Sequence, residues 1–186
     1  DLLVHEDKAI DSVKREMNKE YCDKRLNIDG ILRKVSPMEP SACILRHLFY
    51  NANKELVETY HEDKCSKAVI TIPASFNDIQ REKTKTSAEL AGIDVIGLLQ
   101  EPTAAAIAYN IQPEETILVF DLGGGTLDVS VVKYEKNAKN SYVVLGTPAG
   151  DDHLGGKDWD EALVCPVLRK VHIDPSTINK HGRVWA

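Results

Sequence analysis

The chain has 186 residues, of which 42% are hydrophobic and 28% charged, the balance of a soluble globular protein. Its formal net charge of -6 does not favour a nucleic-acid partner or an anionic membrane surface. Phosphate binding stays open, because backbone N–H groups and a single lysine can build a phosphate site.

The cysteines and the first residues bear on the compartment. Cys22, Cys43, Cys65 and Cys165 contain no C-x-x-C pair, so they favour reduced structural thiols over a zinc site. Residues 1–19 hold no apolar run typical of a signal peptide, and no later run is long enough to span a bilayer. We expect a cytoplasmic protein with neither membrane nor nucleic-acid partners. The start at Asp1 rather than Met indicates a chain that begins inside a larger protein.

Hydrophobic periodicity and turn signals predict helices and strands in mixed order, which indicates an α/β fold with a mixed sheet. In chain order, the expected elements are a helix over Asp7–Lys19, a helix from Ser41 to about His61, a strand over Lys67–Ile72, a helix from Asn77 to Ala91, a strand over Ile93–Leu99, a helix over Thr103–Tyr109, strands over Ile117–Asp121, Thr126–Tyr134 and Ser141–Leu145, and a helix over Asp158–Val171. Residues 20–35 show no clear period, although Asp29-Gly30 is a turn signal.

Local residue chemistry supports two of the helix boundaries. Ser36–Glu39 has the form of a capping box, which Pro40 weakens because a second proline removes the next backbone donor. Asn77–Gln80 offers a second capping box, and Gly92 suits the C-terminal end of that helix.

The segment Phe120–Ser130, FDLGGGTLDVS, carries the strongest chemical signal. A strand delivers Asp121 to its end, and Gly123-Gly124-Gly125 then lets the backbone approach a ligand closely. The N–H groups of such a turn can hold phosphate oxygens, Thr126 adds a hydroxyl, and Asp128 returns a second carboxylate. Two carboxylates beside a phosphate cradle suit a hydrated Mg²⁺ ion.

A simpler interpretation is a hairpin whose glycines only satisfy the geometry of the turn. The acidic residues at both ends argue against it. No Gly-Lys-Ser/Thr follows, so the turn is not a P-loop. A strand rather than a helix follows, so it is not a dinucleotide fingerprint either.

Three further residues have both a functional and a simpler interpretation. Glu101 lies where a strand ends and a helix begins, so it can position a water molecule or only favour the helix dipole. Pro73 can be a simple strand end, and Arg81 can be a solvated surface residue.

Four segments in order resemble the DnaK-type heat shock protein 70 family: Ala68–Asp78, Glu101–Tyr109, Asp121–Ser130 and Gly150–Asp160. The resemblance extends from about Asp7 to Val164. It implies a nucleotide-binding (ATPase) domain with the actin-like, ribonuclease-H-like fold, in which mixed sheets have flanking helices, incomplete here at both ends. It also divides the chain into three parts. Residues 1–115 are the remainder of a first lobe, helical over 1–62 and with a strand–helix core over 67–110. Residues 116–171 are the start of a second lobe with the phosphate-binding hairpin, and residues 172–186 are an unassigned tail.

The resemblance implies roles for the residues around the glycines. Asp121 resembles the acid that holds the Mg²⁺ shell, and Gly123-Gly124-Gly125 resembles the second phosphate loop. Thr126 resembles the hydroxyl residue near the γ-phosphate. Asp128 resembles the acid near the attacking water and a monovalent cation.

Other roles implied by the resemblance fall outside that loop. Glu101 resembles the acid that binds metal water and orients the nucleophile. Lys14 resembles the family's essential lysine, with its neighbour Arg15 as the alternative, although a lysine alone is most often a surface charge. Pro73 and Arg81 resemble a proline switch and its relay arginine, which couple the nucleotide state to the rest of the chaperone.

The implied parent protein binds ATP and hydrolyses it to ADP and phosphate, with Mg²⁺ and K⁺ as candidate ions. Its implied partners are client polypeptides, a J-domain co-chaperone and a nucleotide-exchange factor, in protein folding and the stress response. Exposed sheet edges leave self-association of the chain open.

The sequence also departs from the family pattern. No counterpart of the first phosphate loop, an Asp-Leu-Gly-Thr-Thr strand, or of the adenosine pocket is found. Ser75 stands where an aromatic residue is usual, Asp152 where threonine is usual and Pro40 where an apolar residue is usual. We therefore expect the isolated chain to bind ATP weakly without turnover. The alternatives are a non-catalytic interaction module, or an actin-like or sugar-kinase relative on the same fold.

Overall fold

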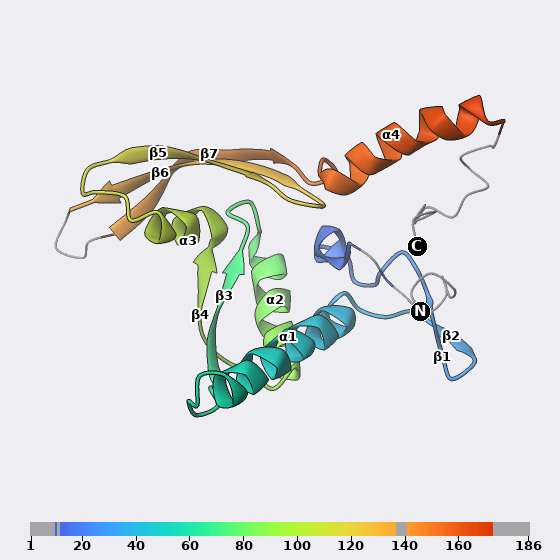
Figure 1. Cartoon of the computed structure of the whole chain (residues 1–186), viewed down its shortest axis with the longest axis horizontal. Coiled ribbons are helices and arrows are strands. Elements are labelled where there is room, and N and C mark those ends of the chain that lie inside the picture. Colours follow the sequence, from blue (N-terminus) through green and yellow to red (C-terminus); the bar gives the residue numbers. More distant parts are fainter. Residues whose placement is uncertain (1–9, 11, 137–140, 173–186) are drawn as a thin grey trace.

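Parallel and antiparallel pairing occur in separate small sheets of this α/β protein (Figure 1). The computed structural model describes residues 10, 12–136 and 141–172. Its strands form an antiparallel hairpin of β1 (Leu26–Ile28) and β2 (Ile31–Arg33), a parallel pair of β3 (Lys67–Ile72) and β4 (Asp94–Gln100), and an antiparallel sheet of β5 (Thr116–Leu122), β6 (Leu127–Glu135) and β7 (Ser141–Asp151). Its helices are the short 3₁₀ helix η2 (Val13–Glu16), α1 (Met38–Glu58), α2 (Asp78–Leu90), α3 (Glu101–Ala108) and α4 (Gly156–Lys170).

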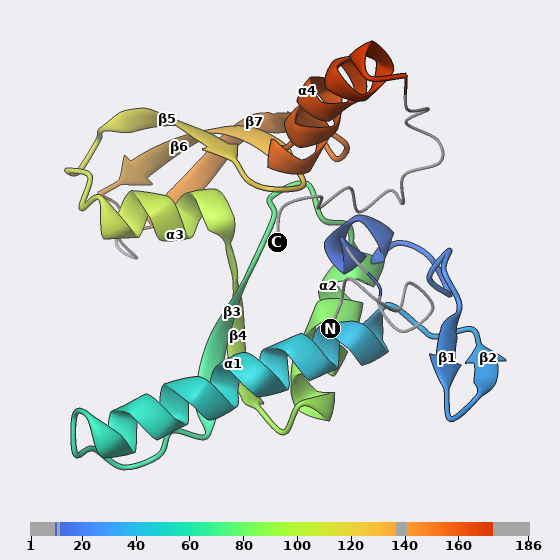
Figure 2. The same cartoon turned by 45° about the vertical axis from the view of Figure 1, so that its right-hand side comes forward.

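Helix α3 lies between the two larger sheets. It contacts β3 and β4 at one side and all three strands of the β5–β7 sheet at the other. Helices α1 and α2 pack against each other, and α2 also contacts β3 and β4 (Figures 1 and 2). Helix α4 extends away from the end of the β5–β7 sheet where β5 turns into β6. This arrangement brings η2, the ends of β3 and β5, and the starts of α3 and α4 toward one region.

The unit formed by β3, α2 and β4 follows from its sequence. Parallel strands need a long crossover, and α2 supplies it. The predicted capping box is confirmed, because the Asn77 side chain accepts from the Gln80 N–H at 3.0 Å and the Gln80 side chain accepts from the Asn77 N–H at 3.0 Å. Gly92 follows the helix with a φ of 84°, a left-handed conformation that glycine adopts without strain.

The largest apolar cluster lies between α3 and the inner face of the β5–β7 sheet. Its buried members come from three segments: Ala106, Ile111 and Val132. Ile117 and Val119 pack against it, as do Val144 and the stacked rings of Tyr134 and Tyr142. Because strand side chains alternate between faces, these residues at every second position of β5 and β6 reach the helix.

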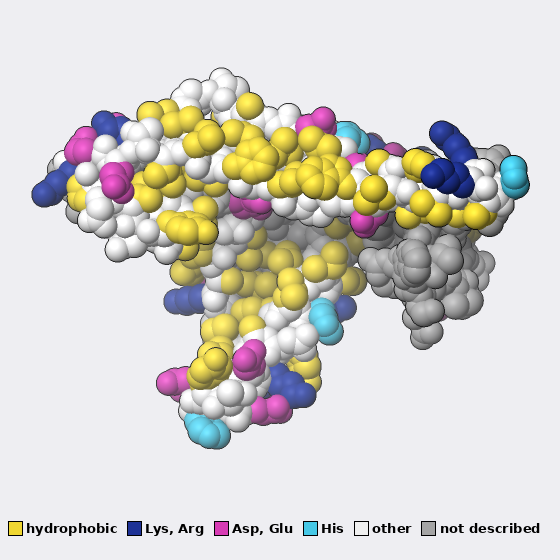
Figure 3. Space-filling model, turned by 45° about the horizontal axis from the view of Figure 1, so that its top comes forward, with side chains coloured by type: hydrophobic (Ala, Val, Ile, Leu, Met, Phe, Trp, Pro, Cys, Tyr) yellow, Lys and Arg dark blue, Asp and Glu magenta, His cyan; other side chains and the backbone are white. Residues whose placement is uncertain are grey.

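The outer face of the same sheet carries exposed hydrophobic side chains, and α4 continues them (Figure 3). Leu118 and Phe120 of β5 are 64% and 61% exposed. On α4 the exposed set, spaced about one turn apart, is Trp159, Leu163 and Val167, and the exposed Val171 follows directly after the helix. No helix of the described residues has the length and apolar character needed to cross a membrane.

The structure confirms the α/β class and the existence of most predicted elements. It corrects the predictions for two segments near the start of the chain. The helix predicted over Asp7–Lys19 is not formed in its described part, because Ser12 has a φ of 53° and only the short η2 follows it; residues 7–9 and 11 lie outside the described residues. Residues 20–35 contain the hairpin of β1 and β2, whose turn is Asp29-Gly30 as its signal indicated. The predicted tail over 172–186 lies, beyond residue 172, outside the described residues.

The observed bounds of other elements differ from the predicted ones by a few residues. α1 begins at Met38 rather than Ser41, because Pro40 is compatible with the first turn, where backbone donors have no helical partner. Only half of the first capping box forms, the Glu39 carboxylate accepting from the Ser36 N–H at 3.0 Å. β7 continues to Asp151 rather than Leu145, through a bulge that shifts its register against β6.

Removing methyl groups from the centre of the main cluster should lower stability. Val132 is fully buried, so Val132→Ala should reduce the free energy of unfolding by roughly 1–3 kcal/mol through lost burial and a residual cavity. Leu118→Ala, on the exposed face of the neighbouring strand, should change it by less than about 0.5 kcal/mol. Urea denaturation followed by circular dichroism measures both, and equal losses would show that the core does not lie between α3 and the sheet.

Candidate functional site

The three carbonyl groups of Gly123-Gly124-Gly125, which we call the glycine turn, each accept a hydrogen bond from a distant segment. The N–H groups of Gly156 and Lys157, in the first turn of α4, donate to the first and second carbonyls at 3.0 Å each. The Nε of Arg15, on η2, donates to the third at 2.8 Å. The turn is therefore held from outside by two segments, in addition to the hairpin bond from the Gly123 N–H to the Thr126 carbonyl.

This anchoring decides which way the N–H groups of the turn point. In a planar trans peptide the C=O and the following N–H point in opposite directions. The N–H groups of Gly124 and Gly125 therefore point away from α4, and that of Thr126 points away from the Arg15 guanidinium. A run of backbone N–H groups turned to one side is the arrangement that holds phosphate oxygens.

Helix α4 can approach the turn this closely because Gly155 precedes it. A Cβ atom built on Gly155 would lie 2.5 Å from the Gly125 nitrogen and 2.6 Å from the Gly124 carbonyl carbon, distances that side chains do not tolerate. A Cβ on Gly156 would meet the Gly124 Cα at 3.7 Å, which is ordinary contact. The position before the helix must be glycine for steric reasons, while the next need not be.

Two aspartates stand opposite each other in the strand register at the turn end of the β5–β7 sheet. Asp121 and Asp128 are register partners, and they lie on the face that carries Val119 and Ser130 further along the strands. Directly opposite residues of an antiparallel pair have Cβ atoms about 4.5–5.5 Å apart, and like charges there are unfavourable. A cation between them would remove this cost. Hydrated Mg²⁺ fits such a site because it takes few carboxylates and keeps most of its waters.

The protein offers no closed metal cage at this place. Among the residues that the structure describes, no group of three or more His, Cys, Asp or Glu side chains gathers as metal ligands. The Ser75 hydroxyl lies 3.5 Å from the Asp128 carboxylate. A cation held here would therefore complete its shell with water or with ligand oxygens.

Lys14 and Glu101 meet although 87 positions separate them in the sequence. The Lys14 Nζ lies 3.1 and 3.2 Å from the two Glu101 carboxylate oxygens. Glu101 begins α3, where the positive end of the helix dipole also favours its charge. The Lys14 side chain stays 46% exposed, so its ammonium group remains accessible to a further anion.

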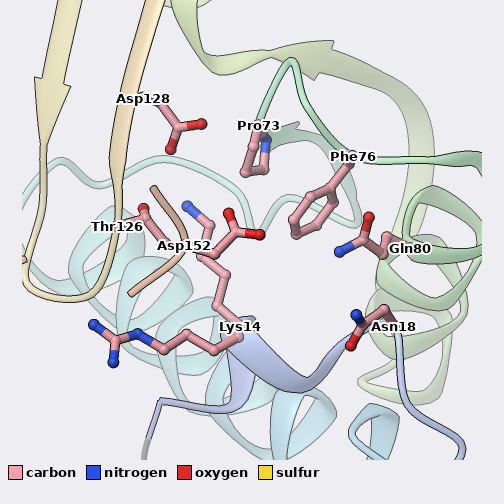
Figure 4. Close-up of a pocket in the computed structure, with 9 residues that line it drawn as sticks. Lys14, Asn18, Pro73, Phe76, Gln80, Thr126, Asp128 and Asp152 are labelled. Atoms are coloured by element: carbon pink, nitrogen blue, oxygen red, sulfur yellow. The ribbon is translucent and has the colours of Figure 1, made fainter. Parts of the chain in front are cut away.

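A small pocket gathers residues from η2, from the segment after β3, and from β6 and its neighbours (Figure 4). It is lined by Lys14, Arg15, Asn18, Pro73, Phe76, Gln80, Thr126, Asp128 and Asp152. Four of the residues that the sequence singled out as site residues thus line one pocket. The glycine turn adjoins it through Thr126, and Glu101 reaches it through Lys14. Asp121 lies across the strand pair from Asp128.

Pro73 and Arg81 are connected through one backbone unit. Pro73 is buried at the end of β3, and its carbonyl accepts from the Phe76 N–H at 3.2 Å. The Phe76 carbonyl in turn accepts from the Arg81 Nε at 2.9 Å. A shift at Pro73 would therefore reach the start of α2 through the peptide groups of Phe76.

Arg15 also forms an ion pair with Asp158, a residue in the first turn of α4. The Arg15 Nη2 lies 2.6 Å from one Asp158 oxygen and the Nη1 lies 3.4 Å from the other. The same carboxylate accepts from the Gly155 N–H at 2.8 Å. The hydrogen bonds from Arg15, foremost, and from Gly155 hold the pKa of Asp158 below its ordinary value.

Sequence reasoning did not find the residues that anchor the turn. Arg15 entered only as a neighbour of Lys14, and Gly155 and Asp158 only as part of a motif. A local signal was present, because two glycines followed by an aspartate within the first helical turn indicate a helix start made for close approach. The identity of the partner that approaches was not readable, since the turn lies about 30 positions earlier.

A comparison with protein families supports the resemblance found in the sequence. The model of a family described as Hsp70 protein matches residues 5–179 of the chain. The match covers the pocket, the glycine turn and α4 together, rather than a single motif.

A side chain at Gly155 should push α4 off the glycine turn. Gly155→Ala should lower the free energy of unfolding by roughly 1–3 kcal/mol, the usual cost of overpacking. Gly156→Ala is the matched control and should cost less than about 0.5 kcal/mol, because its methyl group finds room. Urea denaturation compares the two, and equal stabilities would contradict the close contact at Gly155.

The ionisation of Asp158 should report on Arg15. In a ¹³C NMR titration, the Asp158 carboxyl should titrate below the ordinary aspartate value of about 3.9, and Arg15→Gln should move its midpoint upward. Because the pKa is lowered in the folded state, the stabilisation from this pair is present above the unfolded pKa and disappears as the pH falls through the folded one. A midpoint at or above the ordinary value in the wild type would contradict the pair.

Proposed function

The chain belongs to the Hsp70 family, and on that premise we propose that it is part of the nucleotide-binding domain of a DnaK-type chaperone and binds the phosphates of ATP or ADP. The observation that carries the proposal is the glycine turn. Its three carbonyls are engaged by α4 and Arg15, and the N–H groups of Gly124, Gly125 and Thr126 therefore point the other way, as a phosphate loop requires.

The residues beside the turn supply charges of the right sign. Lys14 is a partly exposed cation at the pocket, and Thr126 adds a hydroxyl next to the N–H groups. In a phosphoryl transfer, catalysis consists of positioning and electrostatic stabilisation, and a lysine beside the phosphates contributes to both. We assign Lys14 to charge stabilisation and Asp128 and Glu101 to orienting the attacking water.

A Mg²⁺ ion would be held by Asp121 directly or through water, and by Glu101 through water. The close pair of Asp121 and Asp128 gives such a cation an electrostatic reason to bind there. When bound, the ion would neutralise charge on the phosphates. Asp128 is also the residue that we assign to a K⁺ ion.

The two larger sheets, β3–β4 and β5–β7, would belong to the two lobes that we propose. Residues 1–115 would belong to the first lobe and residues 116–171 to the second, with Lys14 and Glu101 facing Thr126 and Asp128 across the division. A nucleotide bound to both sets would hold the lobes together. Pro73 and Arg81, linked through Phe76, would carry the nucleotide state away from the site.

The larger cycle is also part of the proposal. The parent chaperone would hydrolyse ATP to bind and release client polypeptides in protein folding and the stress response, in the cytoplasm, with a J-domain co-chaperone and a nucleotide-exchange factor. In the isolated chain one phosphate loop and one lysine face the nucleotide. We therefore propose that it binds nucleotide weakly and does not turn over.

Binding can be measured by NMR titration of the chain with Mg-ADP, Mg-ATP and inorganic pyrophosphate. The amide resonances of Gly124, Gly125 and Thr126 should shift, with weak affinity, and AMP should leave them in place because it lacks a second phosphate. Lys14→Ala should weaken Mg-ADP binding by about tenfold or more, the value of one charge-assisted hydrogen bond. Lys133→Ala, a change on β6 that removes an ion pair with Glu114, should leave the affinity for Mg-ADP unchanged.

The outcomes separate the proposed functions. Absence of any shift with Mg-ADP and pyrophosphate would overturn phosphate binding and favour a non-catalytic interaction module. A micromolar or tighter dissociation constant with several turnovers of phosphate release would show that the chain forms a complete site.

A further inference from the structure

Arg15 is built into the structure more tightly than its neighbour Lys14. Its side chain is 14% exposed, against 46% for that of Lys14. It forms three hydrogen bonds, one to the Gly125 carbonyl and two to the Asp158 carboxylate, with lengths of 2.8, 2.6 and 3.4 Å. Ordering this side chain costs conformational entropy, which its partial burial and its paired hydrogen bonds to one carboxylate offset better than an exposed ion pair would.

These bonds join segments that are far apart in the sequence. Arg15 lies 110 positions before Gly125 and 143 positions before Asp158. The N–H donors of its planar guanidinium connect η2 with the glycine turn and with the start of α4. Only a guanidinium can do this, because it presents Nε and both Nη groups in a fixed fork, whereas a lysine offers one compact ammonium group.

The bond to the Gly125 carbonyl acts on one particular peptide group. The plane that contains this carbonyl also contains the N–H of Thr126, so fixing the carbonyl fixes the direction of that N–H. Gly125 would otherwise allow the plane to rotate, because a glycine on one side removes the steric barrier that a Cβ supplies. Thr126 is one of the residues that line the pocket.

We propose that Arg15 is a positioning residue that sets the orientation of the Gly125–Thr126 peptide, and that its guanidinium acts on a bound phosphate through this peptide rather than by touching it. Asp158 contributes to this positioning, because from α4 it holds the guanidinium of Arg15 in place. The part that concerns phosphate rests on the proposed function, whereas the orientation of the peptide does not.

The competing assignment makes Arg15 a direct phosphate ligand. The two differ in the effect of Asp158. If Arg15 positions the turn, removing the Asp158 charge loosens the guanidinium and weakens nucleotide binding. If Arg15 binds phosphate directly, the same change frees the guanidinium and leaves binding equal or tighter.

The first measurement needs no nucleotide. The ¹⁵N shift of Thr126 and the carbonyl ¹³C shift of Gly125 should change in Arg15→Lys and in Asp158→Asn, while Lys133→Ala serves as the control on the same sheet and should leave both unchanged. Unfolding temperature and amide dispersion show that each variant is folded. Arg15→Lys retains the charge, so it keeps the test informative if a neutral variant does not fold. Unchanged shifts in Arg15→Lys would overturn the inference.

The second measurement is the affinity for Mg-ADP by NMR titration. We expect Arg15→Lys to weaken binding about tenfold, with a smaller loss of several-fold in Asp158→Asn. Equal or tighter binding by Asp158→Asn, with a loss in Arg15→Lys, would assign Arg15 to the phosphate and overturn the positioning role. If the wild type binds no Mg-ADP, the proposed function fails, and the shifts of Thr126 and Gly125 still decide whether Arg15 orients the turn.

Discussion

The hydrogen bonds accepted by the carbonyls of the glycine turn are the constraint on which the rest of the site depends. Three glycines in a row have more conformational freedom than any other tripeptide, so a ligand would bind them only at a large entropic cost. Helix α4 and Arg15 remove that freedom in advance by binding each carbonyl. On the proposed function, the flexibility that allows close approach to a phosphate would be combined with an orientation fixed before a phosphate binds.

The candidate site and the apolar core lie at different positions along the same face of β5 and β6. Along β5 and β6, Val119 and Val132 face α3 and exclude water, whereas Asp121 and Asp128 continue the same alternation at the turn. The strand register keeps the backbones of Asp121 and Asp128 opposite each other, and the register is set by the buried apolar residues behind them. Core packing therefore places two acidic residues side by side on one face of the sheet, and on the proposed function a cation would be their partner.

The sequence was informative wherever a structure depends on neighbouring residues. The strand over 67–72, the capping box at Asn77 and Gly92 were readable because periodicity and capping are local. The break at Ser12 was not, because nothing in a serine predicts a left-handed conformation that its surroundings impose. The partners of Arg15 were equally hidden, since only the folded chain brings residues more than a hundred positions apart into contact.

The pair formed by Lys14 and Glu101 shows how such a site can be both stable and ready to bind. Its two side chains are 46% and 22% exposed, and an ion pair with this much access to water contributes only about 0–1 kcal/mol. A phosphate offers Lys14 several oxygens that carry more charge than a carboxylate. Replacing Glu101 by a phosphate as the partner of Lys14 would therefore lose little ion-pair energy and give a stronger electrostatic interaction. On the proposed function, a Glu101 released in this way would repel the incoming phosphate, and a hydrated cation entering with the phosphate would relieve that repulsion. The proposal therefore expects a metal-bound phosphate to bind better than a bare one.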